Sequence, residues 1–336
     1  MTGERIDLVI VGAGPCGIAA GAAAREAGLS CVLFDRGCIT QSLVGYPYYM
    51  TFFSTAEKLE LAGVPFTIPD SKPNRREALA YYRRVVRYHR LDVRQYEEVV
   101  EIAGVADDFA VRTLRVGGDL RETRCRAVVI ATGGFHEPTR LDVPGEELPK
   151  VIHYYREPYQ FYDQDVLVVG AGNSAMEVAL ELYRNGARVT MVHFLHVLDR
   201  GVKPWVLPDI TNRLKHGEIR MYWRHRVVAV TAESVVLREE GGGRGTELPN
   251  HWVLAMTGWC ADVRLLQSLG VRIDLESGVP AHDPATMETD VPGAFIAGVL
   301  VAGHDANKIF IENGREHGAL LARALLKRLE RQPAAR

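Results

Sequence analysis

The sequence predicts an α/β protein made of two domains that share one architecture. Its 336 residues are enough for about two domains of ordinary size. The order strand, glycine-rich turn, helix, strand occurs twice, and the two turns begin at Gly12 and Gly170. After Trp259 a short strand and a long helix return to the first domain. We therefore expect the second domain to be inserted into the first.

The first unit is recognised from apolar segments separated by glycine. Residues 7–11 form an apolar run that is typical of a buried parallel strand. Residues 15–27 are rich in alanine and stop at Gly28, which predicts a helix with a glycine end. Residues 30–34 predict a second strand ending at Asp35, and residues 126–131 a later strand leading into Thr132, Gly133 and Gly134.

The second unit repeats this order. Residues 165–169 and 188–192 predict strands, with a helix over 175–185 between them that stops at Gly186. The segment 138–163, rich in proline, tyrosine and charge, predicts a hinge, and Gly241–Gly243 the tip of a hairpin. A strand at 295–297 and a helix over 307–328 follow. We expect one domain from residues 1–145 and 260–336, and another from residues 146–259.

Composition excludes several classes of protein. The net charge of −2 gives no basic surface for nucleic acid or an anionic membrane, and 47% hydrophobic residues argue against disorder. The uncharged stretch 8–24 is too short for a membrane span. Five cysteines without a C-x-x-C predict neither a zinc ribbon nor a disulfide scaffold, so we expect no metal and a reducing cytoplasm.

The first glycine motif predicts a dinucleotide site. Gly12, Gly14 and Gly17 have the spacing that allows a tight turn, close approach of a diphosphate and close helix packing. Pro15 and Cys16 lie within the same loop, and Asp35 stands at the following strand end, where a carboxylate can bind ribose hydroxyls.

The second motif has the G-x-G-x-x-A form, from Gly170 and Gly172 through Asn173 and Ser174 to Ala175. His193 stands where an NADH enzyme would place an acidic residue, and Arg200 and Lys203 follow it. These cations suit the additional phosphate of NADPH. Two dinucleotide sites in one chain imply electron transfer between two cofactors, and a permanently bound FAD fits the first site.

The order of these motifs resembles flavoproteins of the thioredoxin-reductase type. More narrowly, the chain resembles the bacillithiol-disulfide reductases. The resemblance lies in the motif Gly14-Pro15-Cys16-Gly17 and in the segments formed by residues 46–47, 51–54, 203–205 and 309–315. The resemblance implies an FAD domain split around an inserted NADPH domain. It also implies reduction of a low-molecular-weight thiol disulfide. Arg36, Thr132, Gly133, Gly298, Lys308 and Ile309 complete the cofactor-binding residues that we expect.

The cysteine pattern favours a mechanism with one thiol. The C-x-x-C of thioredoxin reductases is absent from residues 151–164, and Cys38 has no C-x4-C partner. Val299 stands where many of these flavoproteins carry an aspartate, a departure shared with the narrower family. Cys16 is the candidate nucleophile because a helix N-terminus stabilises a thiolate. We expect Cys31 in the core and no catalytic role for Cys38, Cys125 or Cys260. His304 and Tyr46 are candidate proton donors.

The expected substrate is bacillithiol disulfide, with a bacilliredoxin-type protein as a further candidate partner. We expect a homo-oligomer, either a dimer or a tetramer. Three other functions remain open from the residues alone. They are a ferredoxin or flavodoxin NADP reductase that needs no cysteine, a flavin-dependent monooxygenase, and a nucleotide-binding redox sensor.

Overall fold

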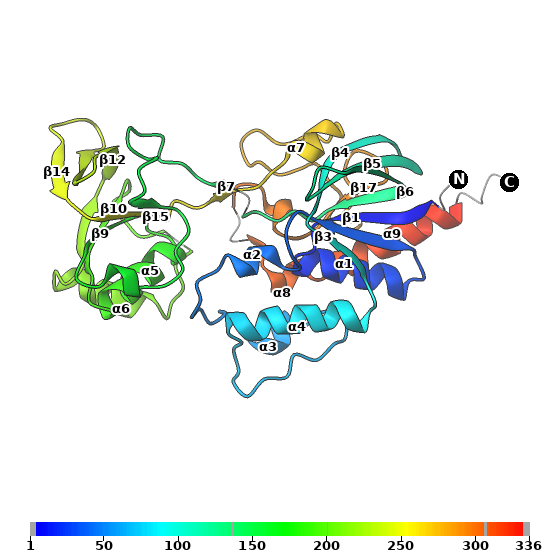
Figure 1. Cartoon of the computed structure of the whole chain (residues 1–336), viewed down its shortest axis with the longest axis horizontal. Helices are drawn as coiled ribbons and strands as arrows, with labels where there is room; N and C mark the ends of the chain where they lie inside the picture. Colours follow the sequence, from blue (N-terminus) through cyan, green and yellow to red (C-terminus); the bar gives the residue numbers. More distant parts are fainter. Residues whose placement is uncertain (1–4, 136, 200, 306–307, 332–336) are drawn as a thin grey trace. The chain divides into compact units, whose positions relative to one another are not determined.

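The computed structural model describes residues 5–135, 137–199, 201–305 and 308–331. The chain divides into two compact units, which Figure 1 shows with their strands and helices labelled. Unit 1 contains Met1–Gly45, Tyr49–Glu137 and Cys260–Arg336, and unit 2 contains Tyr46–Tyr48 and Pro138–Trp259.

The first boundary between the units falls after residue 137, earlier than the expected position after residue 145. The reason is packing of the segment that follows. The N–H of Val230 donates to the carbonyl of Pro144 at 2.8 Å, and Leu141 and Val143 pack against a buried apolar cluster of unit 2. Two short strands pair where the chain passes from one unit to the other. They are β7 (Glu137–Pro138) and β16 (Trp259–Cys260).

Unit 1 is built on a seven-stranded sheet in the order β3-β2-β1-β6-β5-β4, with β17 beside β6. Strands β1 (Ile6–Val11), β2 (Cys31–Asp35), β3 (Asp92–Gln95) and β17 (Ala294–Ile296) run parallel to their neighbours. Strands β4 (Glu97–Val105) and β5 (Asp108–Arg115) are antiparallel and extend β6 (Leu120–Ile130). The central strands are apolar and buried on both faces, as expected for parallel pairing.

Helices α1 (Pro15–Glu26) and α9 (His317–Arg331) lie side by side in unit 1 (Figure 1). Their approach depends on small residues, because a Cβ on Gly318 would stand 2.7 Å from the backbone of Ala19. The remaining helices of this unit are α2 (Gln41–Val44), α3 (Ala56–Leu59), α4 (Arg75–Tyr88), α7 (Arg264–Ser268), the 3-10 turn η2 (Gly298–Ala302) and α8 (Ile311–Gly314).

The predicted helix over 307–328 is wrong at its start. Asn307 lies outside the described residues, and the chain forms α8 at Ile311–Gly314 before α9 begins at His317. The amide of Asn313 explains the later start. Its Oδ1 accepts the N–H of Phe310 at 2.7 Å, and its Nδ2 donates to the carbonyl of Lys308 at 2.9 Å, which holds the preceding turn.

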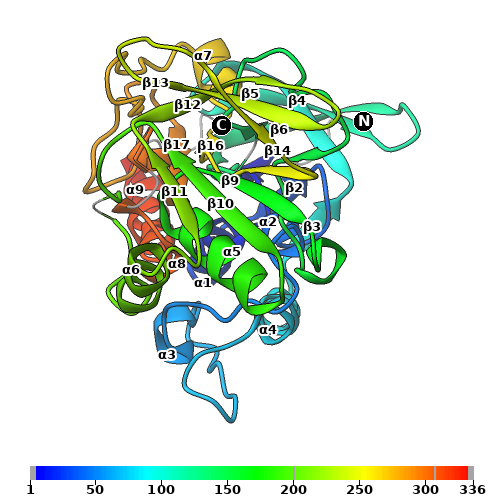
Figure 2. The same ribbon diagram turned by 90° about the vertical axis from the view of Figure 1, so that its left-hand side faces the viewer.

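Unit 2 has a parallel five-stranded sheet in the order β11-β10-β9-β15-β8. Its strands are β8 (Val151–Ile152), β9 (Asp165–Val169), β10 (Arg188–His193), β11 (Arg220–Trp223) and β15 (Trp252–Ala255). Figure 2 shows β9, β10 and β11 side by side. Helices α5 (Asn173–Arg184) and α6 (Leu207–Lys215) and the turn η1 (Tyr159–Phe161) supply side chains to the core.

A smaller antiparallel sheet completes unit 2, with β12 (His225–Val230), β13 (Ser234–Glu239) and β14 (Thr246–Pro249). The predicted hairpin tip at Gly241–Gly243 lies between β13 and β14, where all three glycines have positive φ. Both units thus contain the expected order of strand, glycine turn, helix and parallel strand.

Candidate functional site

The first glycine loop is a compact turn with one open side. Gly12 has φ 107°, and a Cβ there would stand 2.4 Å from the carbonyl oxygen of Ala131. A Cβ on Gly17 would stand 2.0 Å from the carbonyl oxygen of Gly12, so neither position accepts a side chain. Gly14 differs, because no atom lies within 4 Å of where its Cβ would be. Its backbone is therefore open to a diphosphate at the start of α1, and the loop fits a dinucleotide.

Asp35 at the end of β2 organises this loop. Its Oδ2 accepts the N–H of Ala13 and its Oδ1 accepts the N–H of Gly37, both at 2.8 Å. Burial raises the pKa of this carboxyl, and the two backbone donors oppose that shift. Each oxygen keeps a second lone pair that a ribose hydroxyl can use. Arg36 beside it is exposed.

Other predicted cofactor residues of unit 1 follow the carboxyl ends of parallel strands. Thr132 and Gly133 come after β6, and Gly298 comes after β17, at the same sheet edge as Gly12 after β1. Ligands of such sheets bind outside this edge. Lys308 is exposed beside Asp305, at 3.7 Å, and the side chain of Ile309 lies near Gly314.

Cys16 lies in the first turn of α1, and its sulfur is enclosed by glycine backbone. A Cβ on Gly298 would stand 3.1 Å from this sulfur, and one on Gly314 2.9 Å from it. Burial raises the pKa of the Cys16 thiol to about 12. Desolvation of the sulfur thus opposes the stabilisation of a thiolate that is expected at a helix N-terminus.

His317 is a neighbour of this thiol that sequence reasoning missed. Its Nδ1 accepts the N–H of Gly298 at 3.1 Å, and burial lowers its pKa, so the imidazole is neutral with its proton on Nε2. His317 follows Gly314 by three residues, about one helical turn. This spacing alone did not place His317 near the thiol, because the break between α8 and α9 could not be predicted from the sequence.

The two candidate proton donors differ in their surroundings. His304 is exposed, and its ring packs against Gly278, where a Cβ would stand 2.6 Å from the ring. Burial raises the pKa of Tyr46 to about 12, so this phenol keeps its proton at neutral pH. Tyr46 belongs to unit 2, whereas Cys16 and His304 belong to unit 1.

All five cysteines are free thiols. Burial raises the pKa of Cys31 to about 11 and that of Cys125 to about 12. The thiol of Cys38 donates to Oε1 of Gln41 at 3.1 Å, and Cys260 is exposed.

The second glycine loop begins with the same kind of tight turn as the first. Gly170 has φ 123°, and a Cβ there would stand 2.5 Å from the carbonyl oxygen of Met256. Asn173 at the start of α5 fixes the segment that follows β10. Its Nδ2 donates to the carbonyl of Gly201 at 2.8 Å, and its Oδ1 accepts the N–H of Lys203 at 2.9 Å. Ser174 is exposed and Ala175 is buried against the sheet.

His193, at the end of β10, is buried beside an acidic residue. Its side chain is only 3% exposed, and its Nε2 lies 3.4 Å from Oδ1 of Asp199. Burial lowers the pKa of this imidazole, and the carboxylate of Asp199 opposes that shift. Arg200, one of the two cations predicted to bind the additional phosphate, lies outside the described residues.

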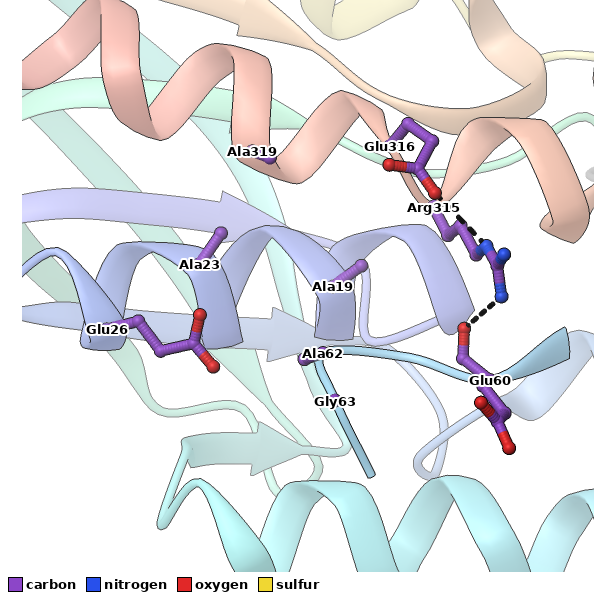
Figure 3. A pocket seen from close by; sticks show the side chains of 9 residues that line it. All are labelled: Ala19, Ala23, Glu26, Glu60, Ala62, Gly63, Arg315, Glu316 and Ala319. Carbon is purple, nitrogen blue, oxygen red and sulfur yellow. Dashed lines mark hydrogen bonds and ion pairs between the residues drawn. The ribbon is translucent and has the colours of Figure 1, made fainter. Parts of the chain in front are cut away.

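A separate cavity of about 370 Å³ lies between α1, the start of α9 and the segment 60–63 (Figure 3). Ala19, Ala23 and Ala319 form its small-residue wall, and Arg315 reaches across to the carbonyl of Glu60 at 2.7 Å. None of the predicted cofactor residues lines it. In the described part of the chain, no three acidic, histidine or cysteine side chains are grouped to hold a metal ion. Nor does any helix in these ranges have the length and apolar character to cross a membrane.

The comparisons with known proteins agree with this architecture. Residues 9–298 match the family described as pyridine nucleotide-disulphide oxidoreductase. The bacilliredoxin reductase Bdr of Bacillus subtilis is 40% identical over 95% of this chain and 97% of its own. The solved bacillithiol disulfide reductase Bdr of Bacillus cereus is 38% identical, with a TM-score of 0.94 over 97% of this chain and all of its own. The thioredoxin reductase of Lactococcus lactis, 23% identical with a TM-score of 0.76 over 98% of this chain and all of its own, shares the fold.

Two glycine loops that each follow a parallel strand, together with these matches, define a pyridine nucleotide-disulphide oxidoreductase of thioredoxin-reductase-like fold. FAD and NADPH are the cofactors of this class of flavoproteins. The chain belongs to the bacillithiol-disulfide reductase family, an assignment that the 40% identity over nearly the full length of both chains supports. The resemblance expected from the motifs is confirmed, and the chain is an oxidoreductase.

Proposed function

We propose that this enzyme uses NADPH to reduce bacillithiol disulfide, or a bacilliredoxin carrying bacillithiol, through Cys16. The observation that carries this proposal is the enclosed position of the Cys16 sulfur. It lies at the same sheet edge as the first glycine loop, between Gly298 and Gly314. A cytoplasmic location and a dimer or tetramer are part of the proposal, and five free thiols agree with a reducing compartment.

Each cofactor has a set of residues that would hold it. In unit 1 the open backbone at Gly14 would take the FAD diphosphate, and Asp35 would accept from a ribose hydroxyl. Thr132, Gly133 and Gly298 would line the same edge. In unit 2 Gly172, Asn173 and Ser174 would face the diphosphate of NADPH, with Lys203 toward its additional phosphate. When bound, FAD would supply the means to accept a hydride from NADPH and to deliver its electron pair to a sulfur.

The chain's own chemistry is thiol–disulfide exchange at Cys16. As its sulfur attacks one sulfur of the substrate, the S–H proton leaves, the substrate S–S bond breaks and a Cys16 mixed disulfide forms. The leaving thiolate takes up one proton and departs as the first free thiol. Two electrons and two protons, one of these protons originating in the hydride of NADPH, then release the second thiol and restore Cys16 as a thiol. The whole reaction consumes one NADPH and one proton for two thiols.

Enclosure by backbone limits what can reach this sulfur. The backbone of Gly298 and Gly314 closes two sides of the sulfur, so a disulfide would have to reach the half-buried Cys16 from another side. The neutral His317 holds the N–H of Gly298 and thereby one wall of the enclosure.

The test is Cys16→Ser, assayed against a panel of bacillithiol, glutathione and coenzyme A disulfides. Serine is no bulkier and suits a helix start, so FAD binding and flavin reduction by NADPH should persist. Disulfide reduction should fall by orders of magnitude, because a hydroxyl ionises too weakly to replace the thiol. Cys38→Ser, Cys125→Ser and Cys260→Ser serve as controls that should stay within about a few-fold of wild type.

Three outcomes would overturn the proposal. Unchanged disulfide reduction by Cys16→Ser would remove the thiol mechanism. Turnover with ferredoxin or flavodoxin that does not need Cys16 would favour an NADP reductase. Oxygen uptake in proportion to an added substrate would favour a monooxygenase.

A further inference from the structure

The carboxylate of Asp199 lies at the second glycine loop. A Cβ on Gly172 would stand 3.1 Å from Oδ2 of Asp199, so the carboxylate covers the side of the middle glycine. In this class of loop the middle glycine is the point where a dinucleotide diphosphate approaches the backbone. An acidic side chain therefore lies where an anion is expected to bind.

Backbone contacts hold Asp199 in this place. Its N–H donates to the carbonyl of Ala171 at 3.3 Å, and its own carbonyl accepts the N–H of Val202 at 3.1 Å. The two bonds from Asn173, to Gly201 and Lys203, fix the chain just beyond. The carboxylate itself is 45% exposed. Asp199 thus lies at the position expected for an anion, on a segment that backbone contacts hold beside the loop.

His193 gives an independent indication that this arrangement changes. Its Nε2 is buried and, among the described residues, makes no hydrogen bond, although Oδ1 of Asp199 lies 3.4 Å away. A buried polar atom without a partner costs free energy, and such atoms are rare in folded proteins. His193 ends β10, the position from which a residue of this fold reaches the ribose of the nucleotide.

We infer that Asp199 sets the affinity of the NADPH site: its carboxylate stands in for the diphosphate at Gly172 and turns away when the nucleotide binds. Nucleotide binding then replaces one anion by another at the loop, and Nε2 of His193 becomes available to the ribose end of the nucleotide. The inference rests on the proposed function, because it takes the second loop as the NADPH site.

A consequence is that wild-type affinity is lower than the loop could provide. Apparent affinity is reduced by the fraction of molecules in which the carboxylate covers Gly172. Removing the negative charge removes both this competition and the repulsion between the carboxylate and the diphosphate. The repulsion acts between partly exposed groups, so added salt should weaken it.

The experiment measures the dissociation constant of NADP⁺ for the FAD-loaded enzyme by calorimetry, which does not depend on turnover. For Asp199→Asn we expect the constant to fall about threefold or more at low salt, and the gain to shrink near 0.5 M salt. Asp199→Ser, which removes the charge and the reach of the side chain, should behave in the same way and serves if Asp199→Asn does not fold.

Asp163→Asn is the matched control. It removes one negative charge from the same unit, beside Arg188 near the first residues of β9 and β10, whereas Asp199 follows the last residue of β10. Asparagine also tolerates the positive φ of 55° found at this position. Its dissociation constant should equal that of wild type. Equal or weaker binding by both Asp199 variants would overturn the inference and leave the proposed function intact. A wild-type enzyme that binds neither NADP⁺ nor NADPH would overturn the proposed function as well.

Discussion

The sulfur of Cys16 lies so close to Gly314 that a methyl group added to this glycine would stand 2.9 Å from it. Cys16 lies in the first turn of α1 and Gly314 ends α8, so residues from opposite ends of the chain form one enclosure. Gly298 closes another side, with 3.1 Å between its added Cβ and the same sulfur. Any side chain at these glycines must move the thiol.

Gly314→Ala should therefore impair both folding and disulfide reduction. Alanine is the better helix residue, but its methyl group collides with the sulfur and lies 3.2 Å from Cγ2 of Ile309. We expect a loss of about 1–3 kcal/mol in the free energy of unfolding. We also expect a fall of about tenfold or more in kcat/KM for the disulfide. Denaturant unfolding and steady-state NADPH oxidation measure the two effects.

A double-mutant cycle with Cys16→Ala separates the sulfur from the other contacts. In a chain without the sulfur, Gly314→Ala should lower the free energy of unfolding by less than it does in wild type. The coupling between the two substitutions should be about 0.5 kcal/mol or more. Additive costs would show that the methyl group is resisted by Ile309 and Gly298 alone, and that the thiol is not held by Gly314.

The sequence predicted the two βαβ units because short-range signals determine them. Apolar runs of strand length, a glycine after the first strand of each unit and an apolar helix that ends at glycine are enough to define such a unit. The register of β1 between β2 and β6 was not predicted, because a strand that is buried on both faces has no polar face to fix it. The helix start at Ile311 was missed because the amide of Asn313 holds the turn at Lys308 and Phe310, and the break between α8 and α9 has no sequence signal that we used.

The site was harder to predict because its electrostatics depend on distant contacts. The position of Cys16 at a helix start suggested a lowered pKa, but Gly298 and Gly314 desolvate the sulfur from segments far along the chain. The orientation of His193 likewise depends on Asp199, which has no fixed spacing in a dinucleotide motif. His317 reaches the site only through the break between α8 and α9.

The raised pKa of Cys16 predicts a dependence of activity on pH. The thiol is protonated below about pH 12, so the thiolate fraction increases about tenfold for each pH unit through the neutral and alkaline range. We expect kcat/KM for the disulfide to increase between about pH 7 and pH 9.5 without a plateau, while flavin reduction by NADPH does not follow that increase. Stopped-flow and steady-state rates over this range check both parts. A plateau near neutral pH would mean that the loaded enzyme stabilises the thiolate.

Lys203 should distinguish NADPH from NADH. Its backbone N–H holds Oδ1 of Asn173, and Lys203→Ala leaves that bond in place while removing the ammonium group. We expect the KM for NADPH to increase by about tenfold, the value of one charge-assisted contact of about 1.5 kcal/mol, with little change for NADH. Asn173→Ala is the comparison, because it loosens the loop for both nucleotides. Equal effects of Lys203→Ala on the two nucleotides would show that this cation does not contact the additional phosphate.

The first glycine loop allows folding and cofactor binding to be separated. Gly14→Ala adds a methyl group where no protein atom lies within 4 Å and should leave the free energy of unfolding of the cofactor-free chain close to that of wild type. The methyl group projects into the space that the FAD diphosphate needs, so FAD affinity should fall by about tenfold or more.

Gly12→Ala should mainly lower the stability of the fold. Its Cβ would stand 2.4 Å from the carbonyl of Ala131 at a φ of 107°, so the fold itself should lose about 2 kcal/mol or more. Thermal unfolding of the cofactor-free proteins and FAD titration by fluorescence quenching measure the two quantities. If Gly14→Ala binds FAD as wild type does, the diphosphate does not approach the chain at this glycine.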